Sequence, residues 1–186
     1  ARTPNEGFFR VAGFPDGGST KPYNTPCQRF EFRPGDLSAE WTNLTDAEVI
    51  VYHFWTDTHL PIAGIDAENH VVSFQYPSGK RFTDDYTSDG ARYIVENVFE
   101  ALDAPGEWYL NRRTGVLYYW PKADEDMQRA EVVAPIAPAL LRLQGDPVGR
   151  RYVEHLRFEG IRWAHTQWQL PPGDCNNAQA SSTVPA

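Results

Sequence analysis

Short stretches in which apolar and polar residues alternate run through most of the chain, and this period of two is typical of β-strands. Residues 47–55 carry apolar side chains on both faces, which predicts a central strand covered on both sides. Residues 70–76 alternate more strictly and predict a half-buried strand of an antiparallel sheet. The turn-forming residues 66–69 lie directly before it, so we expect a strand to precede them.

Residues 107–121 predict a β-hairpin. Two aromatic-rich runs flank a short loop, in which the Asn111 side chain can accept hydrogen bonds from the backbone. Gly115 can adopt the positive φ that closes such a loop. Pro121 ends the second strand, because proline has no N–H to donate to a neighbouring strand.

Helical patterns are scarce. Residues 96–103 place three apolar side chains on one stripe, enough for about two turns. Residues 124–129 could form one more turn. The chain of 186 residues contains 14 glycines and 15 prolines, which leave little room for longer helices. We therefore predict an all-β fold with one or two short helices.

The last third of the chain has a different pattern. Residues 139–143 and 152–163 read as short strands spaced by glycine and proline, which is typical of one coil of a parallel β-solenoid. One coil cannot bury its own interior, so a solenoid needs further coils. We expect an antiparallel β domain over residues 1–125, the start of a parallel β-helix over residues 126–170, and a loop or tail over residues 171–186.

Charge excludes two classes of partner. The formal net charge is −8, and the basic residues do not cluster, whereas a nucleic acid or an anionic membrane surface requires a positive face. The sequence contains no apolar run long enough to span a bilayer. We expect neither nucleic acid nor membrane as a partner.

Two cysteines, Cys27 and Cys175, lie near opposite ends of the chain. They could form a disulfide that closes a very long loop, or they could remain two unpaired thiols. The sequence leaves both alternatives open.

No catalytic motif is evident. The sequence lacks a Gly-x-Ser-x-Gly motif, a Cys-x-x-Cys pair and helically spaced histidines, so we assign no catalytic residue, no metal ligand and no cofactor. Glu107, between Gly106 and Trp108, could be a desolvated acid of the kind that cleaves glycosides, or a hydrogen-bonded residue at the start of a strand.

Aromatic residues are the one surplus in the composition, at 13%. Trp and Tyr rings stack on the apolar faces of sugars. Trp55, Asp57 and His59 place an aromatic ring, an acid and an imidazole at one strand end, which makes them candidate sugar contacts together with Trp41. We expect the remaining tryptophans of the predicted strands to be core residues: Trp108, Trp120 and Trp163.

Several of these stretches resemble a known group of proteins. Residues 95–112, 114–121 and 153–166 are similar to the front part of secreted right-handed parallel β-helix (pectate-lyase-like) carbohydrate-active enzymes. The similarity is greatest to the α-L-fucosidase-like β-helix glycoside hydrolases. Residues 4–9 and 55–66 also fit. Asn111 departs from the pattern, because the family often has Asp there, and either residue serves as a turn cap.

The resemblance implies a fold and a role. It implies an antiparallel β-sandwich-type domain followed by the first coil or coils of a parallel β-helix. In such enzymes the catalytic acids lie on later coils, which here would follow Ala186. The chain would then be a secreted or periplasmic accessory region that caps the solenoid and shapes a glycan cleft, with a polysaccharide and the remaining β-helix as partners.

Two other functions stay open at this point. The chain could be a stand-alone carbohydrate-binding module that uses the Trp55, Asp57 and His59 patch. It could also be a complete small glycosidase with two catalytic carboxylates of its own among its 25 acidic residues.

Overall fold

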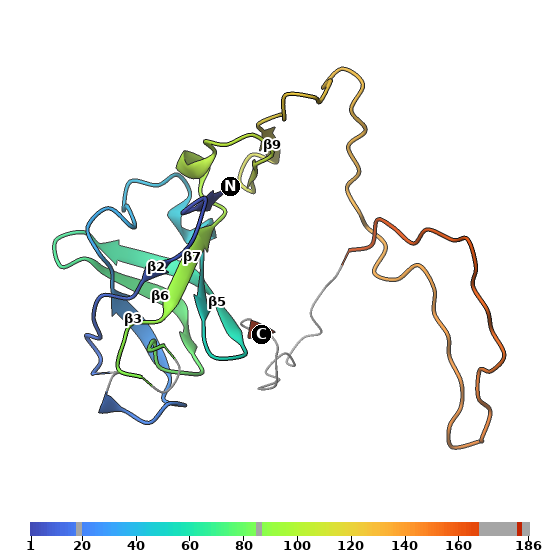
Figure 1. The fold of residues 1–186 in the computed structure, drawn as a ribbon, viewed down its shortest axis with the longest axis horizontal. Helices are drawn as coiled ribbons and strands as arrows, with labels where there is room; N and C mark the ends of the chain where they lie inside the picture. Colours follow the sequence, from blue (N-terminus) through green and yellow to red (C-terminus); the bar gives the residue numbers. More distant parts are fainter. Residues whose placement is uncertain (18–19, 85–86, 168–181, 184–186) are drawn as a thin grey trace. The chain divides into compact units, whose positions relative to one another are not determined.

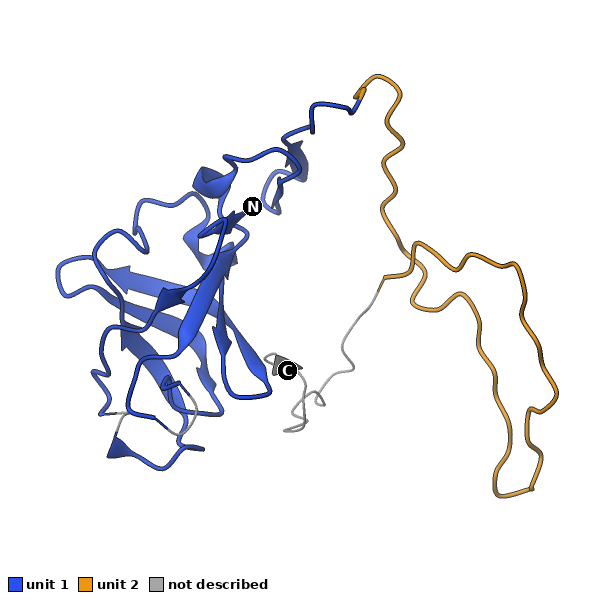
Figure 2. Ribbon diagram, in the orientation of Figure 1, with its two compact units in different colours: residues 1–125, 173–186 blue, residues 126–172 orange. Residues whose placement is uncertain are grey.

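The computed structural model describes residues 1–17, 20–84, 87–167 and 182–183. The chain divides into two units, which are shown separately in Figure 2: residues 1–125 with 173–186, and residues 126–172. Among the described residues, no helix is long and apolar enough to cross a bilayer.

Unit 1 is built from antiparallel strands (Figure 1). Its main sheet has the order β1-β7-β4-β5-β6-β3, with β2 also paired to β7 and β10 to β5. The strands of this sheet are β1 (Arg2–Thr3), β2 (Phe9–Arg10), β3 (Cys27–Glu31), β4 (Glu48–Tyr52), β5 (Asp57–Asp66), β6 (Val71–Ser78), β7 (Arg92–Glu96) and β10 (Ser182–Thr183). A second sheet pairs β8 (Trp108–Asn111) with β9 (Val116–Tyr119). The 3-10 turns are η2 (Leu44–Asp46) and η3 (Phe99–Ala101).

The central strand predicted over residues 47–55 is confirmed as β4. It pairs with β7 on one side and β5 on the other, and its Val49, Ile50 and Val51 are all buried. The strand predicted over residues 70–76 is confirmed as β6. In the turn before β6, the Asp66 carboxylate accepts hydrogen bonds from the backbone N–H groups of Glu68 and Asn69.

Strand β5 belongs to both halves of the main sheet. Its residues 57–61 pair with β4, and its residues from Ile62 onward pair with β6. The pairing register shifts between Ile62 and Gly64, as it does at a β-bulge, where a strand bends. The bend lets one strand pass from one layer into the other.

The two layers close around an aromatic core. The segment after β2 joins the sheet ends, because Val11 donates to Ala91 O and Gly13 pairs with Glu31 of β3. Inside, the Phe30 ring lies 5.0 to 5.5 Å, centroid to centroid, from three other rings. These rings belong to Phe74, Phe82 and Tyr93. The result is the sandwich-like antiparallel domain expected from the sequence.

The predicted hairpin is confirmed as β8 and β9. Asn111 Oδ1 accepts hydrogen bonds from Arg113 N (3.1 Å) and Thr114 N (3.2 Å). Gly115 has a φ of 72°. Both features of the predicted loop are therefore present, and they set the register that pairs Trp108 with Tyr119.

The predicted helices are shorter than expected. Over residues 96–103 only η3 forms, a single 3-10 turn at Phe99–Ala101. Glu96 is instead the last residue of β7, where it pairs across the sheet with Glu48 of β4. Residues 124–129 form turns and not a helix. Sheet pairing outcompetes a two-turn helix, which has few internal hydrogen bonds to offer.

The strands predicted at 139–143 and 152–163 do not form. Within the described residues 126–167 of unit 2, only isolated bridges occur: Ala137 with Thr166, and Asp146 with Arg151. A solenoid strand obtains its hydrogen bonds from the coils above and below it, and the described residues supply no such coils. The prediction of β-helix coils inside this chain is therefore not supported by the described backbone.

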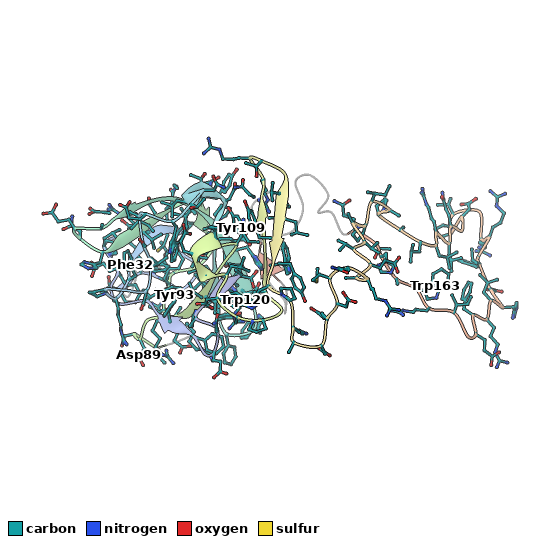
Figure 3. All side chains as sticks on the ribbon, turned by 90° about the horizontal axis from the view of Figure 1, so that it is seen from above. Phe32, Asp89, Tyr93, Tyr109, Trp120 and Trp163 are labelled. Carbon is teal, nitrogen blue, oxygen red and sulfur yellow. The ribbon has the colours of Figure 1, made fainter. Side chains whose placement is uncertain are left out.

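Two further expectations also change. Trp108, Trp120 and Trp163 are not core residues, because their side chains are 56%, 45% and 48% exposed. Figure 3 labels Trp120 and Trp163. Ser182 and Thr183 were expected in a loop or tail, yet they form β10, which pairs in parallel with Asp57 and Thr58 at the open edge of β5.

Cys27 is buried and forms no disulfide with any residue that the structure describes. Cys175 lies outside the described residues. The alternatives for this pair therefore stay as the sequence left them.

Gly90 provides a test of the closed sheet. A Cβ atom at Gly90 would lie 1.8 Å from the backbone oxygen of Val11, in the segment that joins the sheet ends. We expect Gly90→Ala to lower the free energy of unfolding by about 1–3 kcal/mol, because backbone atoms would have to move. Gly79→Ala is the matched control, since nothing lies within 4 Å of its added Cβ. Equal urea midpoints for the two variants would contradict a close contact between Gly90 and the backbone of Val11.

His53 provides a second test, through pH. This histidine is only 3% exposed, and desolvation, aided by the charge of Lys80, lowers its pKa to about 4. The unfolded chain therefore binds a proton near pH 6.5 that the folded chain refuses until about pH 4. We expect the free energy of unfolding to fall by about 3 kcal/mol as the pH is lowered from 6.5 to about 4. In His53→Gln, the free energy of unfolding measured with urea should depend less on pH over the same range. An unchanged dependence on pH would refute a lowered pKa of His53.

Candidate functional site

A row of side chains crosses one end of the main sheet on its outer face. Arg2 of β1 pairs with Glu96 of β7, Glu96 pairs with Glu48 of β4, and Glu48 pairs with Pro61 of β5. Residues that pair directly across a sheet share a face. The neighbours Val49 and Leu60 are buried in the core. Alternation along each strand therefore directs the row away from the core.

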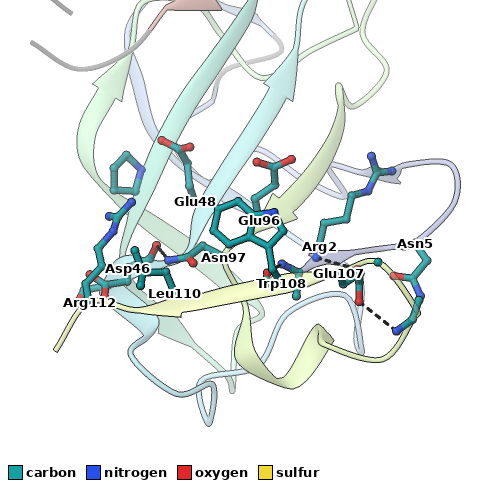
Figure 4. A pocket seen from close by; sticks show the side chains of 15 residues that line it. Arg2, Asn5, Asp46, Glu48, Glu96, Asn97, Glu107, Trp108, Leu110 and Arg112 are labelled. Atoms are coloured by element: carbon teal, nitrogen blue, oxygen red, sulfur yellow. Dashed lines mark hydrogen bonds between the residues drawn. The ribbon is translucent and has the colours of Figure 1, made fainter. Parts of the chain in front are cut away.

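The β8–β9 hairpin lies opposite this row and encloses a cleft of about 600 Å³ with it (Figure 4). Trp108 and Leu110 of β8 line the cleft. Tyr109, between them, points the other way and is fully buried, with its ring 5.2 Å from that of Phe99. In Figure 4 the Trp108 indole extends from β8 toward Glu96. The cleft thus has an aromatic wall and a carboxylate wall.

Glu107 fixes the base of the hairpin. Its Oε1 accepts from the backbone N–H of Arg2 at 3.3 Å. Its Oε2 accepts from the N–H groups of Asp103 at 3.0 Å and Ala104 at 3.2 Å. Of the two roles considered for Glu107, the structure shows the hydrogen-bonded residue at the start of a strand. A carboxylate with these partners positions the hairpin against β1.

His59 holds Glu48 in place. His59 lies on β5, two residues before Pro61, so both belong to the outer face. Its Nδ1 is 2.9 Å from Glu48 Oε2, and its Nε2 is 3.8 Å from Asp57 Oδ1. The hydrogen bond with Glu48 raises the pKa of His59, and the nearby charges of Asp57 and Glu96 act in the same direction, whereas burial opposes them. His59 thus faces two carboxylates, and both favour its protonated form.

The four residues predicted as sugar contacts do not form one group. Asp57 and His59 lie together on the outer face of β5, and His59 reaches the cleft through Glu48. Trp55 lies in the turn between β4 and β5, 44% exposed and packed against Phe54. Trp41 is partly buried and packs against the hydrophobic core.

Sequence patterns did not point to Glu48, Glu96 or Trp108 as site residues. The two glutamates become neighbours only through strand register, and no local signal encodes a pairing between residues 48 apart in the chain. The hairpin pattern includes Trp108, but the alternation of its strand does not distinguish a buried side chain from one that faces a cleft.

Charge in the cleft is predominantly negative. Its lining contains the four acids Asp46, Glu48, Glu96 and Glu107, against the two guanidinium groups of Arg2 and Arg112 and the α-amino group of Ala1. Within the part of the chain that the structure describes, no group of three or more His, Cys, Asp or Glu side chains could hold a metal ion. Carboxylates opposite an exposed indole suit a ligand that has both hydroxyl groups and an apolar face.

Two comparisons with known proteins find a likeness for this chain. Residues 33–122 match the family model described as the GH141 insertion domain. The match begins after β3 and ends just after β9, so it contains both the carboxylate wall of β4 and β7 and the hairpin wall. The match covers the larger part of unit 1 but less than half of the chain, and it is a similarity to an insertion domain.

A solved structure named "Glycoside hydrolase" shares the fold, with a TM-score of 0.63 and 22% sequence identity. The likeness covers 87% of this chain and 30% of that chain, so this chain spans about a third of its length. The search of curated protein sequences finds no match.

The His59–Glu48 pair can be tested by titration. We expect Glu48→Gln to lower the pKa of His59 measured by NMR, because the main stabilising partner of the imidazolium is lost. The stabilising effect of the pair should be fully present below about pH 6.5, the unfolded value, and should vanish as pH rises through the folded pKa. The stability difference between the wild type and Glu48→Gln should therefore shrink with rising pH. Gln75→Ala, on β6, is a control that should leave the His59 titration unchanged.

Proposed function

We propose that this chain is the accessory region of a larger glycoside hydrolase that acts on polysaccharide, and that it shapes one wall of the glycan cleft without carrying the catalytic acids. The support comes from the family model over residues 33–122, which describes an insertion domain. It also comes from the structural likeness, which extends over 87% of this chain but only 30% of a glycoside hydrolase.

The surface of unit 2 is the observation that carries this proposal. Its apolar side chains are widely exposed: Val153 by 45%, Leu156 by 54%, Phe158 by 48%, Ile161 by 54% and Trp163 by 48%. Soluble proteins rarely leave such a concentration of apolar residues in water. Further chain that covers these residues would bury them and supply the missing backbone partners.

We propose that this cover consists of the later coils of a parallel β-helix. The parallel bridge between Ala137 and Thr166 has the direction of pairing that successive coils use. The fucosidase-like activity implied by the sequence resemblance belongs to this proposal, as does a location outside the cytoplasm, where polysaccharides are met.

A stand-alone carbohydrate-binding module fits less well. Such a module would have to keep the apolar side chains of unit 2 in water with nothing to offset the cost. A complete small glycosidase would need two free carboxylates across a bound sugar. Glu48 and Glu96 are neighbours in the cleft, but Glu48 is already paired with His59.

Hydrogen exchange tests the accessory role. We expect the backbone amides of residues 126–167 to exchange rapidly in the 186-residue chain, because few of them have a hydrogen-bond partner within the described residues. In a longer polypeptide that continues past Ala186, the same amides should be protected at least about 100-fold if coils form over them. Residues of β4 and β7 serve as the internal control and should be protected in both. Equal exchange of unit 2 in the two proteins would overturn the proposal.

A further inference from the structure

We infer that the cleft between the hairpin and the outer sheet face is a binding subsite for a neutral sugar, with Trp108 as the stacking platform and Glu48 and Glu96 as hydroxyl acceptors. This inference deepens the accessory role proposed above and rests on it for the class of ligand. It assigns the sugar contacts to residues other than Trp55 and Trp41, which the sequence suggested.

The two walls carry complementary chemistry for a sugar ring. A pyranose has C–H faces that stack on an indole and hydroxyl groups at its rim that donate to carboxylates. Trp108 is 56% exposed and lines the cleft, so its ring is accessible to a ligand. Glu48 and Glu96 are paired on adjacent strands across from it. A cleft of about 600 Å³ lies within the range of small-molecule sites, about 300–1,000 Å³.

Both walls are held in place before any ligand binds. On the sheet side, Glu48 is oriented by His59 at 2.9 Å. On the hairpin side, the fully buried Tyr109 anchors β8, and its hydroxyl accepts a hydrogen bond from Asn43 Nδ2 at 3.0 Å. Glu107 ties the hairpin base to β1. Preorganised walls lower the entropic cost of binding a flexible glycan.

Charge determines which sugars fit. The four carboxylates of the lining outnumber the two guanidinium groups and the α-amino group of Ala1, which leaves the cleft a negative excess. Uronate-rich or sulfated chains would bring further negative charge to this wall, which costs free energy in a partly buried site. Neutral sugars avoid this repulsion and still satisfy the carboxylate oxygens.

The test is calorimetric titration of the 186-residue chain with neutral gluco-, xylo-, manno- and galacto-oligosaccharides and with oligogalacturonate as the anionic probe. We expect at least one neutral probe to bind and oligogalacturonate to bind at least about 10-fold more weakly. Trp108→Ala should weaken the neutral probe by about 10-fold or more, and Glu48→Gln and Glu96→Gln should each do so, since each removes a charged acceptor.

Trp120→Ala is the matched control. Trp120 is also an exposed tryptophan of the hairpin region, at 45%, but it does not line the cleft, so its loss should leave affinity unchanged. Trp108→Phe keeps a stacking ring and should retain part of the affinity, which separates stacking from a folding defect. Thermal unfolding of each variant checks that the fold is intact.

Three results would overturn the inference: no binding of any neutral probe, equal or tighter binding of oligogalacturonate, or loss of affinity in Trp55→Ala with none in Trp108→Ala. A fourth is a failure of acrylamide to quench Trp108, measured in the longer polypeptide as the difference between the wild type and Trp108→Phe, because a shielded indole there would mean that protein and not sugar fills the cleft. If the amides of residues 126–167 are protected from hydrogen exchange in that polypeptide, the accessory role stands even when one of these results rules out the sugar subsite.

Discussion

The bend of β5 at Ile62 and Gly64 is the constraint on which the rest of unit 1 depends. Because one strand pairs first with β4 and then with β6, the chain closes two layers over a single aromatic core. The same bend fixes which residues face outward in the first half of the strand, namely Asp57, His59 and Pro61. Core closure therefore depends on one backbone irregularity, and the half of β5 before it supplies His59, which orients Glu48 of the carboxylate wall.

The cleft combines elements with different origins of rigidity. Its sheet wall is stiff because β4 is bonded on both sides, as the ladder with β5 and β7 shows. Its hairpin wall is a two-stranded sheet, which is marginally stable alone and needs packing against a larger body. Tyr109 and Glu107 supply that packing and attachment. The arrangement offers a fixed set of carboxylates facing an aromatic ring on a separately built arm.

Local patterns foretold the elements whose signals are local. The period of two found β4 and β6, and Asn111 with Gly115 marked the hairpin loop. The β5 bulge and the pairing of Glu48 with Glu96 depend on contacts between distant segments, which alternation does not encode. The strands predicted in unit 2 do not form for a related reason. Solenoid strands need hydrogen bonds from neighbouring coils, and the described residues of unit 2 form only two isolated bridges.

The Glu107 carboxylate has a mechanical meaning. Through it, the first strand and the aromatic arm share one point of attachment, since the backbone of Arg2 and the chain entering the hairpin are both bonded to the same group. Displacement of the Arg2 backbone would therefore also disturb the chain that enters the hairpin and carries Trp108. The first strand and the aromatic wall of the cleft are thereby mechanically coupled.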